Sequence, residues 1–296
     1  MEKHDADIVC KQADKLISKL KKPKIFTMFI DKDDILEEIR KKLIYSCGLY
    51  KKNKLWESSA KCYFKLAAIQ ESMGSFFEAC ESYKNSGDMF KKCGEVNFAL
   101  YTSAIDGYKL AYACAIKEYN FIKAGKIAKE IGYLYDNVLV LHDQALIFYQ
   151  QAIDCMDAEN NNTHDIEEQI AIIYIKQKNF FAGGLAFHNI VKKLISNNKF
   201  TYLIPRYILK ECLCLIASNN TLEARDLLVT YSEYSYFKSS YECNYLSDLI
   251  EIVQNKDEAN FETSMMSLNA IGRIDDLNVA MFKQIKQNIQ TDIIEL

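Results

Sequence analysis

The sequence predicts an all-α fold built from consecutive amphipathic helices. Helix-breaking residues are scarce, with 2 Pro and 10 Gly among 296 residues. Pro lacks a backbone N–H and Gly costs backbone entropy, so both disfavour helix interiors. Apolar residues recur at three- and four-residue spacing between about Asp34 and Gln290, for example at Trp56, Ala60, Tyr63, Phe64, Ala67 and Ala68. Strand-like alternation is nowhere sustained, which favours helices of roughly 12–20 residues separated by short turns.

A loose internal repeat indicates how these helices pair. Segments 74–83, 94–101, 144–149 and 179–187 each combine aromatic side chains with a small residue, most of them after a turn. This spacing places the ring and the small residue on one helical face, where two helices can approach closely. The pattern is tetratricopeptide-like, and it predicts antiparallel helix hairpins stacked into a solenoid.

The chain offers polar breaks but no linker between independent domains. Residues 158–163 and 218–221 are polar and are expected to form loops. Pro205 suits the first turn of a helix, where a missing N–H is harmless. The repeat pattern fades after about residue 234. We therefore expect an N-terminal segment at 1–33, a helical repeat array at 34–233, and a C-terminal helical bundle with its tail at 234–296.

Composition excludes several classes of protein. The net charge of -3 comes from 37 basic and 40 acidic residues, whereas a general nucleic-acid binder needs a basic excess. The N-terminus has no apolar signal-peptide core, and no apolar run reaches the roughly 20 residues of a membrane span. The 10 cysteines are scattered, which is typical of free, mostly buried thiols in a cytoplasmic protein.

No group of residues has the spacing of a catalytic, cofactor or metal site. The histidines His4, His142, His164 and His188 lack metal-ligand spacing to a cysteine or to one another. Cys212 and Cys214 would point about 200° apart on a helix, so they are expected to be buried thiols. Residues 183–184 form a Gly pair without the Lys-Ser or Lys-Thr of a phosphate loop. These observations favour a protein-binding scaffold without a cofactor over an enzyme.

An apolar cluster at residues 25–30 is bracketed by charge, with lysines at 21, 22 and 24 before it and residues 31–34 after it. The cluster either packs onto the first helices or dips into a bilayer. In the second case each of its large side chains contributes up to about 1.5–3 kcal/mol when fully buried, and each nearby lysine adds roughly 1 kcal/mol at an anionic surface. In that case the residues expected to enter the bilayer surface are Phe26, Met28, Phe29 and Ile30.

Several collinear segments carry a family resemblance. The C-terminal ones are 239–243 (SSYEC), 271–276 (IGRIDD) and 285–290 (IKQNIQ), and earlier ones lie at 54–68, 79–92, 121–126 and 149–152. In this order they resemble the alpha-type soluble NSF attachment proteins, or SNAPs, over nearly the whole chain. The C-terminal segments and the apolar cluster both favour the alpha type over the gamma type.

The resemblance implies a fold, partners and site residues. The expected fold is a twisted sheet of helix hairpins with a C-terminal bundle. The expected function is a non-enzymatic adaptor at the membrane surface, which binds a four-helix SNARE bundle and recruits and stimulates the AAA+ ATPase NSF for SNARE disassembly. Lys126 matches a basic SNARE-contact position of the family, and Lys123 and Lys129 lie beside it. The expected ATPase contacts are the tail residues Asp292, Glu295 and Leu296.

Four positions depart from the family pattern and reduce the positive charge expected on the SNARE-contact surface. Asn120, Asp165, Gln169 and Tyr241 stand where alpha-type SNAPs usually carry Arg or Lys. Two other functions compete with the adaptor interpretation. A generic tetratricopeptide-like scaffold of another multi-subunit complex would not need the C-terminal motifs, and a helical-repeat enzyme would need a set of catalytic residues that the sequence does not offer.

Overall fold

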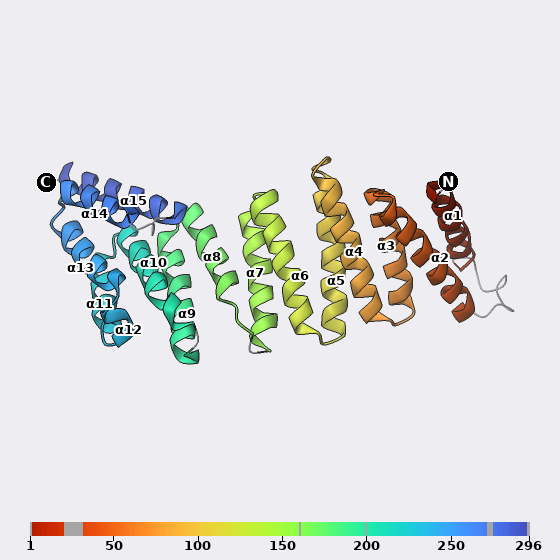
Figure 1. The fold of residues 1–296 in the computed structure, drawn as a ribbon, viewed down its shortest axis with the longest axis horizontal. Helices are drawn as coiled ribbons and strands as arrows, with labels where there is room; N and C mark the ends of the chain where they lie inside the picture. Colours follow the sequence, from red (N-terminus) through yellow and green to blue (C-terminus); the bar gives the residue numbers. More distant parts are fainter. Residues whose placement is uncertain (1, 21–31, 160, 199, 271–274, 295–296) are drawn as a thin grey trace. The chain divides into compact units, whose positions relative to one another are not determined.

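The computed structural model describes residues 2–20, 32–159, 161–198, 200–270 and 275–294. The chain divides into two compact units, Met1–Asn162 and Thr163–Leu296. The first unit consists of α1 (Glu2–Leu20), α2 (Lys32–Lys52), α3 (Trp56–Ser72), α4 (Phe76–Gly94), α5 (Leu100–Lys117), α6 (Phe121–Tyr133), the π-helical turn η2 (Leu134–Val138) and α7 (His142–Asp157). Figure 1 shows these helices side by side, each packed on its neighbour in the sequence.

The second unit begins at α8 (His164–Lys176). It continues with α9 (Phe180–Asn197), the 3-10 turn η3 (Thr201–Leu203), α10 (Ile204–Ala217), α11 (Thr221–Tyr231), α12 (Ser235–Lys238), α13 (Tyr241–Gln254), α14 (Glu258–Ala270) and α15 (Asp276–Ile294). No strand occurs among the described residues. The predicted all-α class is confirmed.

Close approach of small residues to rings explains how neighbouring helices pack in the first unit. A Cβ added at Gly87 of α4 would lie 2.7 Å from the ring of Tyr108 of α5, and one added at Gly132 of α6 would lie 2.7 Å from the ring of Tyr149 of α7. Neither distance leaves room for a methyl group, so only glycine lets the ring lie flat on the facing helix. The predicted helix-hairpin packing is confirmed, and at these two contacts a ring of one helix lies against a glycine of the next.

The helices begin earlier in the chain than the sequence analysis predicted. We expected them from about Asp34, but α1 precedes that point and packs on α2 through the fully buried Ala6 and Ala13. Its apolar residues Ala6, Val9, Ala13, Leu16 and Leu20 do recur at three- and four-residue spacing, so the periodic signal was present in the sequence and was missed. Tyr50 of α2 donates a 2.7 Å hydrogen bond to Asp7 of α1.

Helix α10 is the central helix of the second unit. Nearly all of its residues are buried, and it packs against α9, α11, α13 and α15. Pro205 lies in its first turn as predicted, and Cys212 and Cys214 are fully buried as predicted. The threefold division at residues 33 and 233 is not tested by these contacts and stays a prediction.

Candidate functional site

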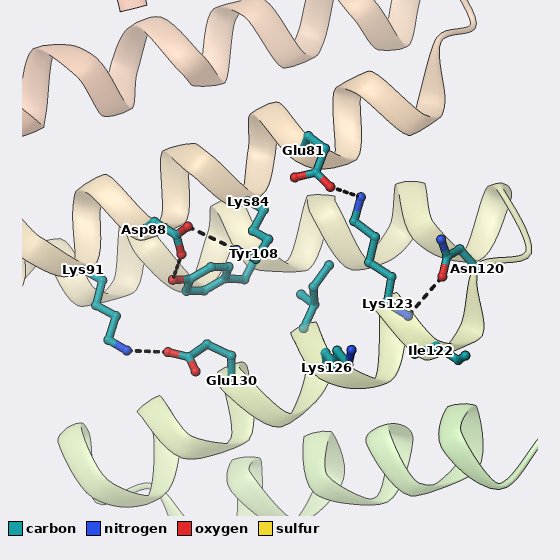
Figure 2. Close-up of a pocket in the computed structure, with 11 residues that line it drawn as sticks. Glu81, Lys84, Asp88, Lys91, Tyr108, Asn120, Ile122, Lys123, Lys126 and Glu130 are labelled. Carbon is teal, nitrogen blue, oxygen red and sulfur yellow. Dashed lines mark hydrogen bonds and ion pairs between the residues drawn. The ribbon is translucent and has the colours of Figure 1, made fainter. Parts of the chain in front are cut away.

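A groove of about 640 Å³ runs between α4, α5 and α6 of the first unit. Figure 2 shows its charged side chains facing one another across the groove. It is lined by Glu81, Lys84, Asp88, Lys91, Tyr108, Asn120, Ile122, Lys123, Lys126, Ile127 and Glu130. Four lysines and three acidic residues therefore face one space, and the ion pairs among them determine which charges a partner can meet.

Three of the four lysines are paired with the three acidic residues. Lys84 lies 3.2 Å from Asp88 on the same helix. Lys91 of α4 reaches Glu130 of α6 at 2.5 Å, and the third pair joins Lys123 of α6 to Glu81 of α4, also at 2.5 Å.

Lys126 is the remaining cation of the groove. It is exposed, and among the described residues it has no ion-pair or hydrogen-bond partner. The net positive charge of the groove is therefore carried by this one side chain, which the sequence singled out as a SNARE-contact residue.

Lys123 has a different environment, although it lies only one helical turn away. Its side chain is 18% exposed, and its Nζ lies 4.8 Å from the centroid of the Phe77 ring. Burial favours a lower pKa for Lys123, but the hydrogen bond that Lys123 donates to Glu81 and the neighbouring charges outweigh it, so the pKa is raised. Lys123 thus holds α6 against α4 as a charged pair. Lys129 is half-buried, does not line the groove, and is engaged in an interaction of its own.

The departure at Asn120 has a structural reason. Asn120 is the N-cap of α6, and its side-chain oxygen accepts a 3.1 Å hydrogen bond from the backbone N–H of Lys123. An Arg or Lys cannot accept that bond, whereas Asn is among the best N-cap residues. At the other departures, Asp165 is exposed in the first turn of α8, Gln169 is half-buried one turn later, and Tyr241 begins α13 with its ring stacked on Tyr245.

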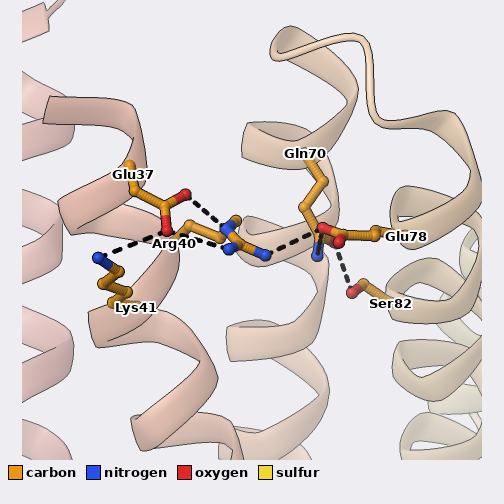
Figure 3. Close-up of polar contacts among 6 residues, drawn as sticks. All are labelled: Glu37, Arg40, Lys41, Gln70, Glu78 and Ser82. Atoms are coloured by element: carbon orange, nitrogen blue, oxygen red, sulfur yellow. Dashed lines mark hydrogen bonds and ion pairs between the residues drawn. The ribbon is translucent and has the colours of Figure 1, made fainter. Parts of the chain in front are cut away.

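A polar network fixes the three helices α2, α3 and α4 in the first unit (Figure 3). Arg40 of α2 donates to Glu37 at 2.7 Å and to Glu78 of α4 at 3.2 Å. Glu78 also accepts from the side-chain amide of Gln70 of α3, and the side-chain oxygen of Gln70 accepts from the hydroxyl of Ser82 of α4 at 2.6 Å. The hydrogen bond from Arg40 lowers the pKa of Glu37. Because Gln70 and Ser82 are buried, the network keeps α4, one wall of the groove, in register with α2 and α3.

The sequence analysis missed an exposed aromatic pair in the second unit. Phe200, directly before the η3 turn, is 41% exposed, and Tyr202, within it, is 76% exposed. Phe200 has a left-handed backbone with φ of 54°, and its ring lies 5.6 Å from that of His164 at the start of α8. Two aromatic residues just before Pro205 were the available signal, because a turn that precedes a helix rarely needs two rings for its own packing.

A second groove, of about 520 Å³, lies between α13 and α14. Asp248, Glu251 and Asp257 line it together with amide, hydroxyl and tyrosine side chains, and its described lining contains no lysine or arginine. The groove is therefore anionic. The sequence analysis placed the C-terminal contact surface only in the tail and missed this groove.

Some predicted residues fall outside the described part of the chain. Phe26, Met28, Phe29 and Ile30, as well as Glu295 and Leu296, lie outside the described residues, and the side chain of Asp292 in α15 is not described either. Their roles stay predictions. Across the residues that are described, no helix is both long and apolar enough to cross a membrane, and no three His, Cys, Asp or Glu side chains are grouped so that they could hold a metal ion.

A known protein family matches most of the chain. A model of the family described as "Soluble NSF attachment protein, SNAP" matches residues 4–290. The chain belongs to the SNAP family. The resemblance to alpha-type SNAPs that the sequence segments indicated is thereby confirmed.

Individual SNAP relatives match this chain at low identity over most of their length. The alpha-soluble NSF attachment protein of Vitis vinifera is 22% identical over 253 residues, covering 84% of this chain and 85% of the relative. The Saccharomyces cerevisiae protein of the same name is 23% identical over 265 residues, 86% of each chain. A probable vesicular-fusion protein sec17 homolog of Neurospora crassa is 22% identical over 300 residues, 97% of each chain.

Proposed function

We propose that this SNAP is an adaptor for SNARE disassembly, which binds a four-helix SNARE bundle and recruits and stimulates an NSF-type AAA+ ATPase. The observation that carries the proposal is the family match, which spans residues 4–290. Relatives that match over most of their length carry the names alpha-soluble NSF attachment protein and vesicular-fusion protein. The adaptor itself performs no chemistry; it positions the bundle and the ATPase.

The groove of the first unit is the proposed SNARE-contact surface. An acidic bundle would meet the exposed charge of Lys126 directly, and complementary charge raises the association rate and fixes orientation more than it raises affinity. The Lys84 and Lys91 pairs are partly exposed, and such pairs contribute only about 0–1 kcal/mol. Their lysines can therefore turn from the internal acid to an acidic partner at little cost. The exposed Tyr202 supports a further, apolar contact in the second unit.

The anionic groove between α13 and α14 is the proposed ATPase-contact surface, together with the tail residues Asp292, Glu295 and Leu296. Three acidic residues and no described basic residue line it, so it suits a basic surface on the partner. In this proposal residues 1–33 hold a membrane loop, 34–233 grip the bundle, and 234–296 engage the ATPase. The protein would then work in the cytoplasm as a peripheral membrane protein, with Phe26, Met28, Phe29 and Ile30 in the bilayer surface.

A reconstitution experiment tests this function. The purified protein is incubated with a soluble SNARE bundle and the ATPase, and the assembly is recovered with a non-hydrolysable ATP analogue. After ATP and Mg²⁺ are added, the bundle should come apart only when all components are present. A generic scaffold would fail to bring the bundle and the ATPase together, and that result would refute the proposal.

A further inference from the structure

The row of charged side chains that α4 contributes to the first groove continues into a phenylalanine. Glu81, Lys84, Asp88 and Lys91 line the groove, and Phe77 lies four residues before the first of them. This spacing of three and four residues places Phe77 on the same face of α4, one helical turn beyond the lining. Phe77 is 58% exposed, so much of its ring is not buried by the fold.

Helix α6 provides a second apolar side chain at the same end of the groove. Ile122 lines the groove and is 40% exposed. Figure 2 shows it at the end where Glu81 pairs with Lys123, away from Lys91. Lys123 links the two apolar residues, because it follows Ile122 in the chain and its Nζ lies 4.8 Å from the centroid of the Phe77 ring. We call Phe77 and Ile122 the apolar end of the groove.

The apolar end is held in place by contacts between helices. The pair of Lys123 with Glu81 joins α6 to α4 directly beside it. Glu78, which follows Phe77, accepts hydrogen bonds from α2 and α3 in the network of Figure 3. Because these contacts fix the helices that carry Phe77 and Ile122, the two side chains lose less freedom when a partner covers them.

Charge does not attract an acidic partner to the apolar end itself. Two lysines beside it, Lys117 and Lys123, are paired with glutamates, and Glu118 in the turn before α6 is exposed and adds a negative charge. The attraction comes from Lys126, which lies one turn after Ile122 on α6. The apolar end therefore contributes through burial of its side chains, which salt does not screen as it screens charges.

We propose that the apolar end of the groove contacts and buries an apolar side chain on the surface of the acidic SNARE bundle. This inference rests on the proposed function and names the feature of the bundle that the groove selects. The occupant follows from continuity, because Ile122 lines the same groove as Lys126 and shares one face of α6 with it, so that a partner bound at Lys126 also covers Ile122.

The spacing on α6 predicts what the bundle must present. Ile122 and Lys126 are four residues apart, which places their Cβ atoms about 6 Å apart on the helix surface. A helix of the bundle matches this spacing when an acidic residue and an apolar residue stand three or four positions apart. The groove should therefore prefer a bundle with such a pair over one whose surface is acidic alone.

Fluorescence anisotropy with a labelled soluble SNARE bundle tests the proposal on the full-length protein. Phe77→Ser with Ile122→Ser should weaken binding about tenfold. The factor should be the same at low and at high salt, whereas the loss caused by Lys126→Glu should shrink as salt rises. Phe77→Leu with Ile122→Leu should restore binding, because both replacements keep apolar surface at the end of the groove.

Phe181→Ser with Leu222→Ser is the matched control. Both residues are exposed apolar side chains at the second position of a helix, α9 and α11 respectively, and neither lines one of the two grooves. Their replacement should leave the affinity unchanged. Ile122→Ser alone keeps the contact between Phe77 and Lys123, so it tests binding even where the double variant melts at a lower temperature, and it should weaken binding about threefold.

Two results would overturn this inference without touching the proposed function. The first is wild-type affinity of the Phe77 and Ile122 variant at every salt concentration while Lys126→Glu is impaired. The second is a loss in that variant which shrinks with salt as fast as the loss in Lys126→Glu, since the two residues would then act through the neighbouring charges. Failure of the wild-type protein to bind the bundle would instead refute the proposed function, and this inference with it.

Discussion

Charge reversal at Lys126 should mainly weaken SNARE binding, whereas charge reversal at Lys123 should mainly destabilise the fold, although the two residues lie one turn apart on α6. Lys126 is exposed and has no ion-pair partner among the described residues. Its replacement by Glu places a like charge four residues before Glu130, which costs only about 0.2–0.5 kcal/mol. Glu130 is already neutralised by Lys91. For a unit of this size that corresponds to a fall in Tm of roughly 1–2 °C.

Lys123→Glu should destabilise the fold instead. The change removes the 2.5 Å pair with Glu81 and sets two carboxylates against each other at a site where the lysine side chain was 18% exposed. A partly exposed pair contributes about 1 kcal/mol, and the new repulsion adds a similar amount after screening by solvent. A loss of about 1–2 kcal/mol lowers Tm by roughly 2–8 °C.

The affinity for a labelled soluble SNARE bundle should fall more in Lys126→Glu than in Lys123→Glu, which reverses their order in stability loss. Lys126→Glu removes one rim contact and introduces one repulsion, so each bound copy loses about 1–2 kcal/mol of affinity at low salt. The loss should shrink as salt rises, and Lys126→Arg should restore binding because it keeps the charge. Fluorescence anisotropy across a salt series and thermal melts by circular dichroism measure both quantities. An unchanged affinity of Lys126→Glu for the bundle at every salt concentration would refute the assignment of SNARE binding to this groove.

Two further predictions concern the second unit. Glu211 raises the pKa of His188 through a 2.8 Å hydrogen bond, so the stabilisation is present below the unfolded value of about 6.5 and is lost as pH rises through the folded pKa. His188→Gln should therefore lower stability more near pH 6 than near pH 8, by about 1 kcal/mol since solvent screens the ring; equal melting differences at both pH values would contradict this. Deletion of residues 293–296, or Leu296→Ala, should leave SNARE binding and Tm intact but slow ATPase stimulation and disassembly; wild-type disassembly rates at saturating ATPase would remove the tail from the mechanism.

The fold was predictable because its determinants are local in the sequence. Apolar spacing identifies amphipathic helices, and the small residues beside rings indicated which faces pack. Gly132 and Tyr149 show why this works: one residue must lack a side chain for the other to lie flat on the facing helix. Helix α1 was missed although its apolar residues recur at helical spacing: Ala6, Cys10, Ala13 and Leu16 all lie in or against the core that α1 shares with α2.

The state of each charge in the candidate site was not predictable from the sequence. Lys123 and Lys126 look equivalent on a helical wheel, yet the partner of Lys123 is 42 residues away in the chain. Only the packing of α6 against α4 brings Glu81 within reach. Asn120 is a second example. Its position in the sequence marks it as a lost basic contact, but in the structure its side chain accepts an N-cap hydrogen bond. An ion pair between helices depends on tertiary geometry, which spacing within one helix does not encode.

The pairing pattern also constrains how such a groove can grip an acidic partner. If all four lysines were unpaired, they would repel one another, and this repulsion would destabilise the protein when no partner is bound. With three of them neutralised by Glu81, Asp88 and Glu130, the free protein avoids that cost. In the proposed function each copy would present a single strong cation and two exchangeable ones, so its affinity for one bundle would be modest. Several copies on one bundle would multiply these modest contacts through effective concentration, and each copy could release as the bundle unwinds. Weak individual grips therefore suit an adaptor that must bind its substrate and then let it go.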